Sequence, residues 1–498
     1  MVKIAEINNQ NPWWTQEIEF CRYDFHLTRA QPVFFKRQSL NLERGNIYIL
    51  RGCRQVGKTT YLKATVRGLI EKGVSPKQIL YLSLDFFTSR RELRNAINYF
   101  LELTREVDKV YLLFDEITSL ENWNLEFKYL TDQGITQKST VIATGSSAIR
   151  LKEKGELLPG RGLEGNEHYF KPLSFREFVL QTVEFISDHI SIKELKNSLE
   201  KLRATLSDVS IDLWSDFEHI KESFQKIAFF KRELQMLFRM YLITGGIPSI
   251  VNHYLVQKYE KNEEKVDRFL AEIFMRDVVG DISRLKKQET IARDILRGVV
   301  EKYGSRFSFT SLAQETGLYH QVSMDYLEFL ENSFILFILF AYDFNEKRIK
   351  TKGAKKVFFL DPFVFNSIKA YLSGRDVWQV INDMLQSEEI QSHTIEGVVA
   401  AHLLGHKEIP YLRNGETFIW IYYDKQGKEI DTVIKQNSHY LGIEVKYQAQ
   451  VDQRALKRIQ PVRRYILLSK EDVAIGERSL IIPVDVFLSL LPMSERNL

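Results

Sequence analysis

The chain has 498 residues, of which 44% are hydrophobic and 27% are charged, which is the composition of an ordinary soluble protein with two to four domains. The formal net charge of +4 permits a nucleic-acid partner without arguing for one, and two cysteines, Cys21 and Cys53, exclude a disulfide framework and fit a reducing cytosol. Because there is no signal-peptide core and the longest uncharged apolar run, residues 334–342, is too short for a membrane span, we expect a cytoplasmic protein without a membrane segment.

The first half of the chain changes pattern at Asn46. Before it, Trp13 and Trp14 lie among charged residues, which suggests a helical lead-in packed on the next part of the chain, with no apparent chemistry. After it, buried strands alternate with amphipathic helices, for example at residues 90–103, and this alternation predicts a parallel sheet covered on both faces. The expected strands are residues 47–50, 79–84, 110–114 and 140–144.

The first strand runs into a glycine-rich loop. Its residues are Gly52, Cys53, Arg54, Gln55, Val56, Gly57, Lys58, Thr59 and Thr60. This is a G-x-x-x-x-G-K-[ST] phosphate loop in a strand–loop–helix setting. The glycines let backbone N–H groups converge on phosphate oxygens at a helix N-terminus. We expect a nucleoside triphosphate here, with Lys58 on its β- and γ-phosphates and Thr59 as a ligand of Mg²⁺.

Two further strands end in polar side chains. Residues 110–114 run into Asp115 and Glu116, a Walker B pair in which Asp115 would hold the hydration shell of Mg²⁺ and Glu116 would polarise the attacking water. The next strand ends at Thr144, the candidate sensor that positions water against the γ-phosphate, with Ser146 as a second choice and an ordinary Ser/Gly turn as the alternative.

An arginine follows one short predicted helix later. Arg161, in the sequence LPGR, fits an arginine finger that reaches the γ-phosphate of a neighbouring subunit in a homo-oligomer. A purely structural arginine fits the same sequence equally well.

Beyond residue 178 the pattern becomes helical. Apolar residues at three- and four-residue spacing predict helices across residues 179–300, interrupted by a sharp turn at 244–248. Residues 308–330 have helix-turn-helix spacing and precede two apolar strands that could form a wing. A packing module that continues the helical lid is the alternative, and the acidic residues Asp325, Glu328 and Glu331 are poor partners for phosphates.

From Lys355 onward a smaller α/β unit is expected. It contains strands at residues 357–360, 418–423, 430–434 and 440–445, with helices to about residue 406 and a flexible connection at 373–392. In the last strand Glu444 and Lys446 share one face. Asp431 lies in the neighbouring strand and Glu396 on an amphipathic helix. Asp431 and Glu444 could share a divalent metal while Lys446 orients a water, as phosphodiester hydrolysis requires.

The motifs GCRQVGKTT, VYLLFDEIT, VIATGSS, LPGR and residues 171–178 resemble, in this order, a large prokaryotic group of AAA+-type ATPases close to the STAND signalling ATPases. Trp123 and Lys128 also fit that pattern, whereas Cys53 replaces a common proline. The resemblance covers roughly residues 40–280 and implies binding of ATP or ADP and hydrolysis of ATP. The turn before Pro248 is similar to the Gly-x-Pro turn that contacts adenine in STAND proteins, which makes Pro248 the implied contact.

The C-terminal residues resemble the PD-(D/E)XK nuclease core, with Glu396 as the helical acid, and also the domain of unknown function that usually follows this type of ATPase. The resemblance implies a metal site at Glu396, Asp431 and Glu444. Many such domains are nuclease-like without demonstrated cleavage, so cleavage stays open. A basic cluster after the last strand fits either a phosphate backbone or a solvated helix face. It comprises Arg454, Lys457, Arg458, Arg463 and Arg464.

The predicted fold class is α/β: a P-loop parallel sheet with a helical lid, a winged-helix module and a smaller restriction-endonuclease-like domain. The expected ranges are 1–40 (lead-in), 41–180 (ATPase core), 181–300 (lid), 301–360 (winged helix) and 361–498 (nuclease-like domain). One hypothesis is an ATPase whose nucleotide state controls a nuclease-like domain acting on DNA. The other is a nucleotide-dependent switch or scaffold whose C-terminal domain only binds a partner.

Overall fold

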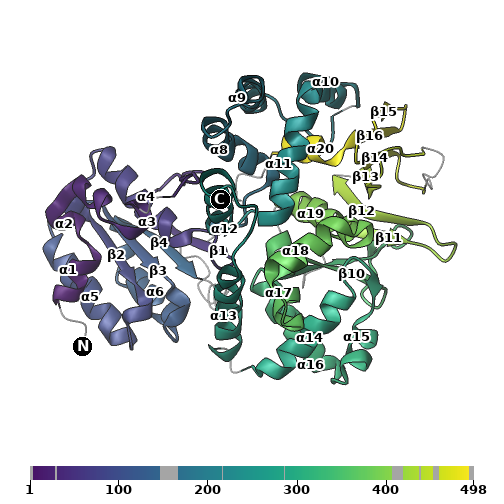
Figure 1. Cartoon of the computed structure of the whole chain (residues 1–498). Helices are drawn as coiled ribbons and strands as arrows, with labels where there is room; N and C mark the ends of the chain where they lie inside the picture. The colour runs from purple at the N-terminus through teal and green to yellow at the C-terminus, as the bar shows by residue number, and fades with distance from the viewer. Residues whose placement is uncertain are drawn as a thin grey trace. The chain divides into compact units, whose positions relative to one another are not determined.

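The computed structural model describes residues 4–28, 31–145, 166–215, 217–284, 287–406, 419–436, 439–452 and 459–492. These residues form two compact units, coloured along the chain in Figure 1. Among the described residues, the first unit comprises those up to Lys171 together with Asn332–Phe334, and the second comprises Pro172–Glu331 and those from Ile335 to residue 492. The molecule as a whole is α/β, as the sequence predicts.

A parallel five-stranded sheet forms the centre of the first unit, in the order β2-β3-β4-β1-β5. Four strands lie where their apolar runs predict them, and they bury nearly all of their residues, as expected for a sheet covered on both faces. The fifth strand is not predicted by the sequence pattern, because it is short and its first two residues are only half-buried. The strands are β1 (Ile47–Gly52), β2 (Ile79–Ser83), β3 (Val110–Asp115), β4 (Ser139–Gly145) and β5 (Glu167–Phe170).

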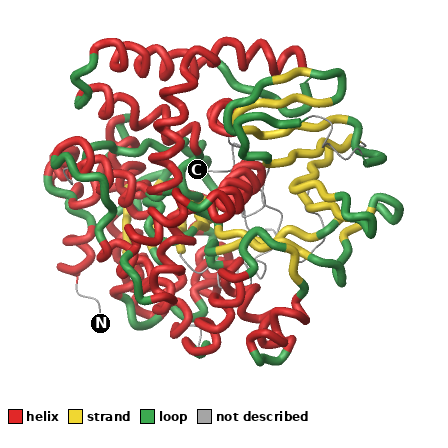
Figure 2. The backbone as a smooth tube through the Cα atoms, turned by 45° about the vertical axis from the view of Figure 1, so that its right-hand side comes forward, coloured by secondary structure: helices red, strands yellow, loops and turns green. Residues whose placement is uncertain are grey.

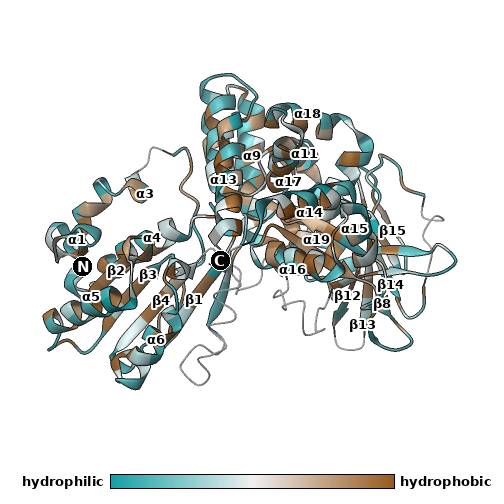
Figure 3. Ribbon diagram, turned by 90° about the horizontal axis from the view of Figure 1, so that it is seen from below, coloured by the Kyte–Doolittle hydropathy of each residue, from teal (hydrophilic) through white to brown (hydrophobic). Residues whose placement is uncertain are grey.

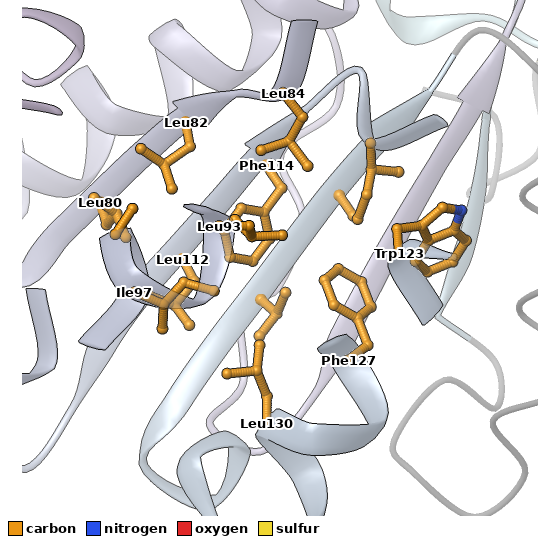
Figure 4. Packing of buried hydrophobic residues seen from close by; sticks show 14 of the residues in the cluster. Leu80, Leu82, Leu84, Leu93, Ile97, Leu112, Phe114, Trp123, Phe127 and Leu130 are labelled. Carbon is orange, nitrogen blue, oxygen red and sulfur yellow. The ribbon is translucent and has the colours of Figure 1, made fainter. Parts of the chain in front are cut away.

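Helices α4 (Lys58–Glu71), α5 (Arg90–Leu103) and α6 (Trp123–Asp132) connect these strands. Figure 4 shows Leu93 and Ile97 of α5 and Phe127 of α6 packed against strand residues such as Leu112 and Phe114. This apolar layer holds the strand ends in fixed positions. Figure 3 shows the strands β1 to β4 largely in the colour of hydrophobic residues.

The lead-in is helical, as predicted, with α1 (Ile4–Gln10), α2 (Trp13–Gln16), a 3₁₀ turn and α3 (Phe25–Thr28). Trp13 is fully buried. The indole nitrogens of Trp13 and Trp14 both donate to the carbonyl of Ile79, at 3.0 and 2.8 Å. The lead-in therefore fastens onto strand β2 of the sheet.

The second unit begins with helices, as predicted. Ser174 and Glu177 form a capping box at the start of α8, which satisfies N–H groups that have no partner within the helix. The helices are α8 (Phe175–Asp188), α9 (Lys193–Asp208), α10 (Phe217–Ile227), α11 (Lys231–Thr244), α12 (Pro248–Leu255), α13 (Arg268–Arg284) and α14 (Glu289–Glu301).

A small sheet and two helices follow. Helix α15 (Phe309–Thr316) ends at Gly317, whose φ of +68° is a left-handed conformation that favours glycine, and α16 (His320–Asn332) comes next. Three antiparallel strands have the order β6-β10-β7, so that β10 is central. These strands are β6 (Arg306–Phe307), β7 (Leu336–Phe340) and β10 (Lys355–Phe359); β8 (Tyr342–Asp343) and β9 (Arg348–Ile349) form a separate hairpin.

Three helices continue the chain: α17 (Pro362–Ser373), α18 (Val377–Gln386) and α19 (Glu388–His406). The expectation of a flexible connection at residues 373–392 is wrong. Helix α18 buries Val377, Val380, Ile381 and Met384, which are spaced to form one apolar helix face. The acidic residues around this face obscure the helical pattern in the sequence.

The last part of the second unit is a six-stranded mixed sheet in the order β11-β12-β13-β14-β16-β15 (Figure 2, yellow). The pairs β11–β12 and β12–β13 are antiparallel, whereas β13–β14 and β14–β16 are parallel. The elements are β11 (Ile419–Tyr423), β12 (Glu429–Gln436), β13 (His439–Val445), β14 (Arg464–Ser469), β15 (Ala474–Ile475), β16 (Ser479–Pro483) and α20 (Val484–Leu490).

Across the described ranges, no single helix has the length and apolar character to cross a membrane. One pair of segments, Phe217–Thr244 and Pro248–Glu260, passes by length and composition only when taken together, across a bend of 118°.

Candidate nucleotide site and acidic cluster

The glycine-rich loop joins the end of β1 to the start of α4, and its backbone makes a tight curl. Gln55 and Gly57 adopt φ values of +64° and +95°, in the left-handed region. A Cβ atom at Gly52 would lie 2.1 Å from the backbone oxygen of Phe170 on β5, so only glycine fits there. A Cβ atom at Gly57 would meet no atom of the described residues within 4 Å. The loop therefore has packed strands on one side and open space on the other, as a phosphate cradle needs.

Lys58 is the first residue of α4 and lies over this loop. Its ammonium donates hydrogen bonds to the carbonyl oxygens of Gly52 and Cys53, both at 2.8 Å. Burial lowers the pKa of Lys58, and the nearby carboxylate of Glu116 opposes that shift. Loop carbonyls thus hold the ammonium in a position next to the Walker B acid.

Asp115 ends strand β3 among hydroxyl donors. Tyr81 on β2 donates its phenolic O–H to Asp115 Oδ2 at 3.0 Å, and Thr144 on β4 donates a short hydrogen bond to Asp115 Oδ1. Asp115 is 6% exposed. Neighbouring parallel strands therefore bring the predicted metal-binding carboxylate and the predicted sensor into direct contact.

Glu116 follows Asp115 with a left-handed φ of +49°. Its backbone N–H donates to Asp115 Oδ1 at 3.1 Å and to Thr144 Oγ1 at 3.2 Å. Its side-chain Oε1 accepts from the hydroxyl of Thr118 at 2.8 Å. An unusual backbone conformation held by several bonds is common at functional sites. No local sequence pattern predicts this strained turn.

The structure adds two residues to the nucleotide site that the sequence does not predict. Tyr81 bonds to Asp115 as described, and its apolar strand gives no sign of this role. Arg37, from the segment before β1, donates to the carbonyl of Val56 in the loop at 3.3 Å and to that of Lys171 at 3.0 Å. A single arginine 19 positions before the loop residue that it contacts carries no local sequence signal.

Other predicted residues are placed differently. Ser146 and Arg161 lie outside the described residues. Pro248 is the first residue of α12 in the second unit, so its contact with adenine stays a prediction. The turn before it has a packing role: Gly246 donates its N–H to Asp361 Oδ2 at 2.7 Å, and a Cβ atom there would be 2.1 Å from the carbonyl oxygen of Leu173.

The predicted nuclease-like residues meet in the second unit. Asp431 on β12 accepts the backbone N–H of Val445 at 2.9 Å, next to Glu444, and Lys446 lies 3.4 Å from Glu444 Oε2. Glu396 on α19 joins them through an unpredicted residue, Lys356 on β10. The Lys356 ammonium lies 2.6 Å from Glu396 Oε1 and 3.2 Å from Asp431 Oδ1. We call Lys356, Glu396, Glu429, Asp431, Glu444 and Lys446 the acidic cluster.

Burial dominates the electrostatics of the acidic cluster. It raises the pKa of Glu396 to about 8, an effect that Asp431 strengthens and Lys356 opposes. It raises the pKa of Glu444 to about 7, against the attraction of Lys446. Oε1 of Glu444 is buried and has no hydrogen-bond partner among the described residues. Burial also disfavours the charge on Lys356, but Asp431, Glu396 and Glu429 outweigh it and hold its pKa above the usual value. In the part of the chain that the structure describes, no group of three or more His, Cys, Asp and Glu side chains has the arrangement of a metal site.

The basic cluster is only partly described, because Arg454, Lys457 and Arg458 lie outside the described residues. Arg464 on β14 donates to the carbonyl oxygens of Trp214 and Ser215 and lies 4.2 Å from the ring centroid of Phe217. This arginine fastens the sheet to the segment before α10, which accounts for it without a phosphate.

Three different parts of the chain each match a known protein family. Residues 44–179 match the family described as AAA domain, residues 235–375 match a domain of unknown function (DUF8612), and residues 391–487 match another (DUF4143). The phosphate loop, the Walker B pair and the parallel sheet all lie within the first match. This part of the chain is therefore similar to an AAA domain and contains a phosphate loop.

Three curated relatives are similar to this chain, and all are uncharacterized. Two are from Methanocaldococcus jannaschii: one is 24% identical over 64% of this chain and 61% of its own length, the other 25% identical over 66% and 64%. One from Haemophilus influenzae is 24% identical over 62% of this chain and 66% of its own length. The match thus spans less than two thirds of each of these relatives.

Solved structures with weak similarity include Cdc6p from Pyrobaculum aerophilum and PCH-2 from C. elegans. The first is 11% identical with a TM-score of 0.26 and covers 77% of this chain and 97% of that one. The second is 13% identical with a TM-score of 0.26 and covers 53% of this chain and 65% of that one. At these scores neither supports a conclusion about function.

Proposed function

We propose that the chain hydrolyses ATP with Mg²⁺ at the loop between β1 and α4. The observation that carries this proposal is that Lys58, Asp115 and Glu116 meet at one edge of the parallel sheet. Lys58 lies over the loop, and Asp115 is bonded both to Thr144 and to the backbone of Glu116. Such a set supplies the cation, the metal-binding carboxylate and the water-polarising carboxylate that phosphoryl transfer to water requires.

Each residue has a distinct role in this proposal. Lys58 exchanges its bonds to loop carbonyls for bonds to phosphate oxygens, and Glu116 orients a water and accepts its proton. Thr59 and Asp115 would hold Mg²⁺, which supplies charge neutralisation on the phosphates when bound. The donor chemistry fits, because Asp115 presents a carboxylate at the edge of the site and Thr59 a hydroxyl in the first turn of α4. Thr144 fixes both Asp115 and Glu116.

Turnover in a homo-oligomer is part of the proposal, with Arg161 acting on the nucleotide of a neighbouring subunit and Pro248 on adenine. Mixing Arg161→Ala subunits with Lys58→Ala subunits tests the arginine. An arginine acting between subunits predicts recovery of ATP hydrolysis in the mixture. If activity does not return, Arg161 acts within its own subunit or has a structural role.

We further propose that the domain from residue 361 onward is a nuclease-like domain whose activity on DNA is controlled by the nucleotide. The gathering of Glu396, Asp431, Glu444 and Lys446 supports this, because the three acids come from one helix and two adjacent strands, as the resemblance implies, and Lys446 directly follows the second strand. The module of α15, α16 and the strands β6, β10 and β7 would be a winged helix.

A second candidate is a nucleotide-dependent switch with an inert C-terminal domain. One observation favours it: an ammonium, that of Lys356, lies between the carboxylates of Glu396 and Asp431. Cleavage of plasmid and linear DNA, measured with Mg²⁺ or Mn²⁺ and ATP, separates the two candidates. The nuclease proposal predicts cleavage that Lys446→Ala abolishes. If no form of DNA is cleaved, the nucleotide-dependent switch is the candidate that remains.

A further inference from the structure

The ammonium of Lys356 lies close to three carboxylates. It lies 2.6 Å from Glu396 Oε1, 2.9 Å from Glu429 Oε1 and 3.2 Å from Asp431 Oδ1. The ammonium donates hydrogen bonds to Glu396 and Asp431 and forms an ion pair with Glu429. Two of the three carboxylates, Glu396 and Asp431, belong to the set that the sequence assigns to a divalent metal, of which Glu444 is the third member. A cation therefore already lies between two oxygens of that predicted set.

The fold fixes this lysine in place. Strand β10, which carries Lys356, is paired on both sides by β6 and β7, and Lys356 is only 4% exposed. Helix α19, which carries Glu396, packs closely on the same strand. A Cβ atom at Gly397 would lie 2.7 Å from the hydroxyl of Tyr303 and 3.1 Å from the ring of Phe358 on β10. Lys356 is thus part of the packed interior and not of a loop that can swing away.

The neighbouring lysine on the same strand makes different contacts. Lys355 donates to the carbonyl oxygens of Thr351 and Gly353, both at 2.8 Å, and lies 4.3 Å from the ring centroid of Phe309. Both lysines are buried, and successive residues of a strand point to opposite faces. Of the two, only Lys356 reaches the acidic cluster, so Lys355 is a matched control for it.

One further oxygen in the acidic cluster lacks a partner among the described residues. Glu444 is 5% exposed, and its Oε1 accepts no hydrogen bond from them, while Lys446 lies near its other oxygen. Asp431 accepts the backbone N–H of Val445, the residue that follows Glu444. Without the Lys356 ammonium, Glu396 and Asp431 would lose the cation between them and would join Glu444 in a buried set of carboxylates. Oxygen ligands of this kind are what hard divalent cations select.

We propose that Lys356 is the resident cation of the acidic cluster, and that its ammonium excludes a divalent metal from the position between Glu396 and Asp431. Replacing Lys356 by a neutral side chain should open that position to a metal. The inference rests on the proposed nuclease-like centre only because that proposal identifies Glu396 and Asp431 as candidate metal ligands. Its test measures the binding of a metal and not the cleavage of DNA.

The test is Mn²⁺ binding to the full-length protein without nucleotide, measured by electron paramagnetic resonance of free Mn²⁺. We expect Lys356→Gln to bind one more Mn²⁺ per chain than the wild type, and to lose that ion again when Asp431→Asn is added. Lys355→Gln should match the wild type. Mn²⁺ should raise the unfolding temperature of Lys356→Gln by more than that of the wild type.

Two results would overturn the inference. One is a folded Lys356→Gln variant that binds no additional Mn²⁺. The other is a Mn²⁺ site in the wild type that Asp431→Asn alone removes, and this comparison decides the question even if Lys356→Gln does not fold. Cleavage of DNA is scored separately: Mn²⁺ binding by Lys356→Gln without any cleavage would support the inference and count against the nuclease proposal.

Discussion

Tyr81 donates its phenolic hydroxyl to Oδ2 of Asp115 over 3.0 Å, and the lead-in holds this tyrosine in place. The side chain of Asn11 accepts the backbone N–H of Tyr81 at 2.6 Å and donates to its carbonyl oxygen at 2.9 Å. The ammonium of Lys63 lies 3.9 Å from the tyrosine ring centroid. The segment before β1 thus contributes to the geometry of a carboxylate that the sequence assigns to magnesium.

The first prediction concerns this contact. Tyr81→Phe removes one of the donors to Asp115, and a hydrogen bond to a charged group contributes about 1.5–3 kcal/mol. We expect ATP hydrolysis to fall by roughly tenfold and the Mg²⁺ concentration for half-maximal rate to rise, with little change in nucleotide affinity. Tyr111→Phe, at the opposite end of β3, is the control. An unchanged Mg²⁺ requirement would contradict a role for Tyr81 in orienting Asp115.

The second prediction concerns Thr144. Thr144→Val keeps the shape of the side chain but removes the hydroxyl that joins Asp115 to the backbone of Glu116. ATP hydrolysis should fall by roughly 10- to 100-fold while ATP still binds, because the loop is unchanged. Thr144→Ser retains the hydroxyl and should retain most of the activity. Equal loss in both variants would contradict this role of the hydroxyl, because Thr144→Ser retains it.

The third prediction concerns stability at the start of the phosphate loop. Gly52→Ala forces a Cβ atom to within 2.1 Å of the Phe170 backbone oxygen, which must move. We expect the free energy of unfolding to drop by about 3 kcal/mol or more. Gly68→Ala, within α4, meets no atom of the described residues within 4 Å and should stabilise by about 0.5–1 kcal/mol. Urea unfolding of both variants measures this, and similar effects at the two positions would contradict the packing argument.

The fourth prediction concerns pH. Asp361 is fully buried at the start of α17, and burial raises its pKa from 3.8 to about 6, against the hydrogen bonds from Gly246 and Phe363. The folded state binds the proton of the Asp361 carboxyl more tightly than the unfolded state does. Its contribution to the free energy of unfolding is therefore present below pH 3.8 and is lost as the pH rises through 6. Between about pH 3 and 7 the wild type should lose about 3 kcal/mol of unfolding free energy relative to Asp361→Asn. If the unfolding free energies of the two proteins change with pH in the same way, the raised pKa of Asp361 is contradicted.

Local patterns in the sequence predict part of this structure and not the rest. Strands β1 to β4 and the phosphate loop are encoded in contiguous apolar runs and in glycine spacing, so the sequence alone reveals them. Strand β5 is too short and too polar to be recognised. Lys356 is 40 positions from Glu396 and 75 from Asp431, and no local spacing reveals such contacts. Helix α18 escapes prediction because acidic residues surround its apolar face.

The central claim is that ATP is hydrolysed at the loop between Gly52 and Thr60. Steady-state ATP hydrolysis with Mg²⁺, measured on the wild type, Lys58→Ala and Lys72→Ala, tests it most directly. Lys72 is exposed at the far end of α4 and serves as the control. We predict that Lys58→Ala loses at least about 100-fold of the wild-type rate, whereas Lys72→Ala keeps it. Hydrolysis by Lys58→Ala at the wild-type rate would contradict the claim.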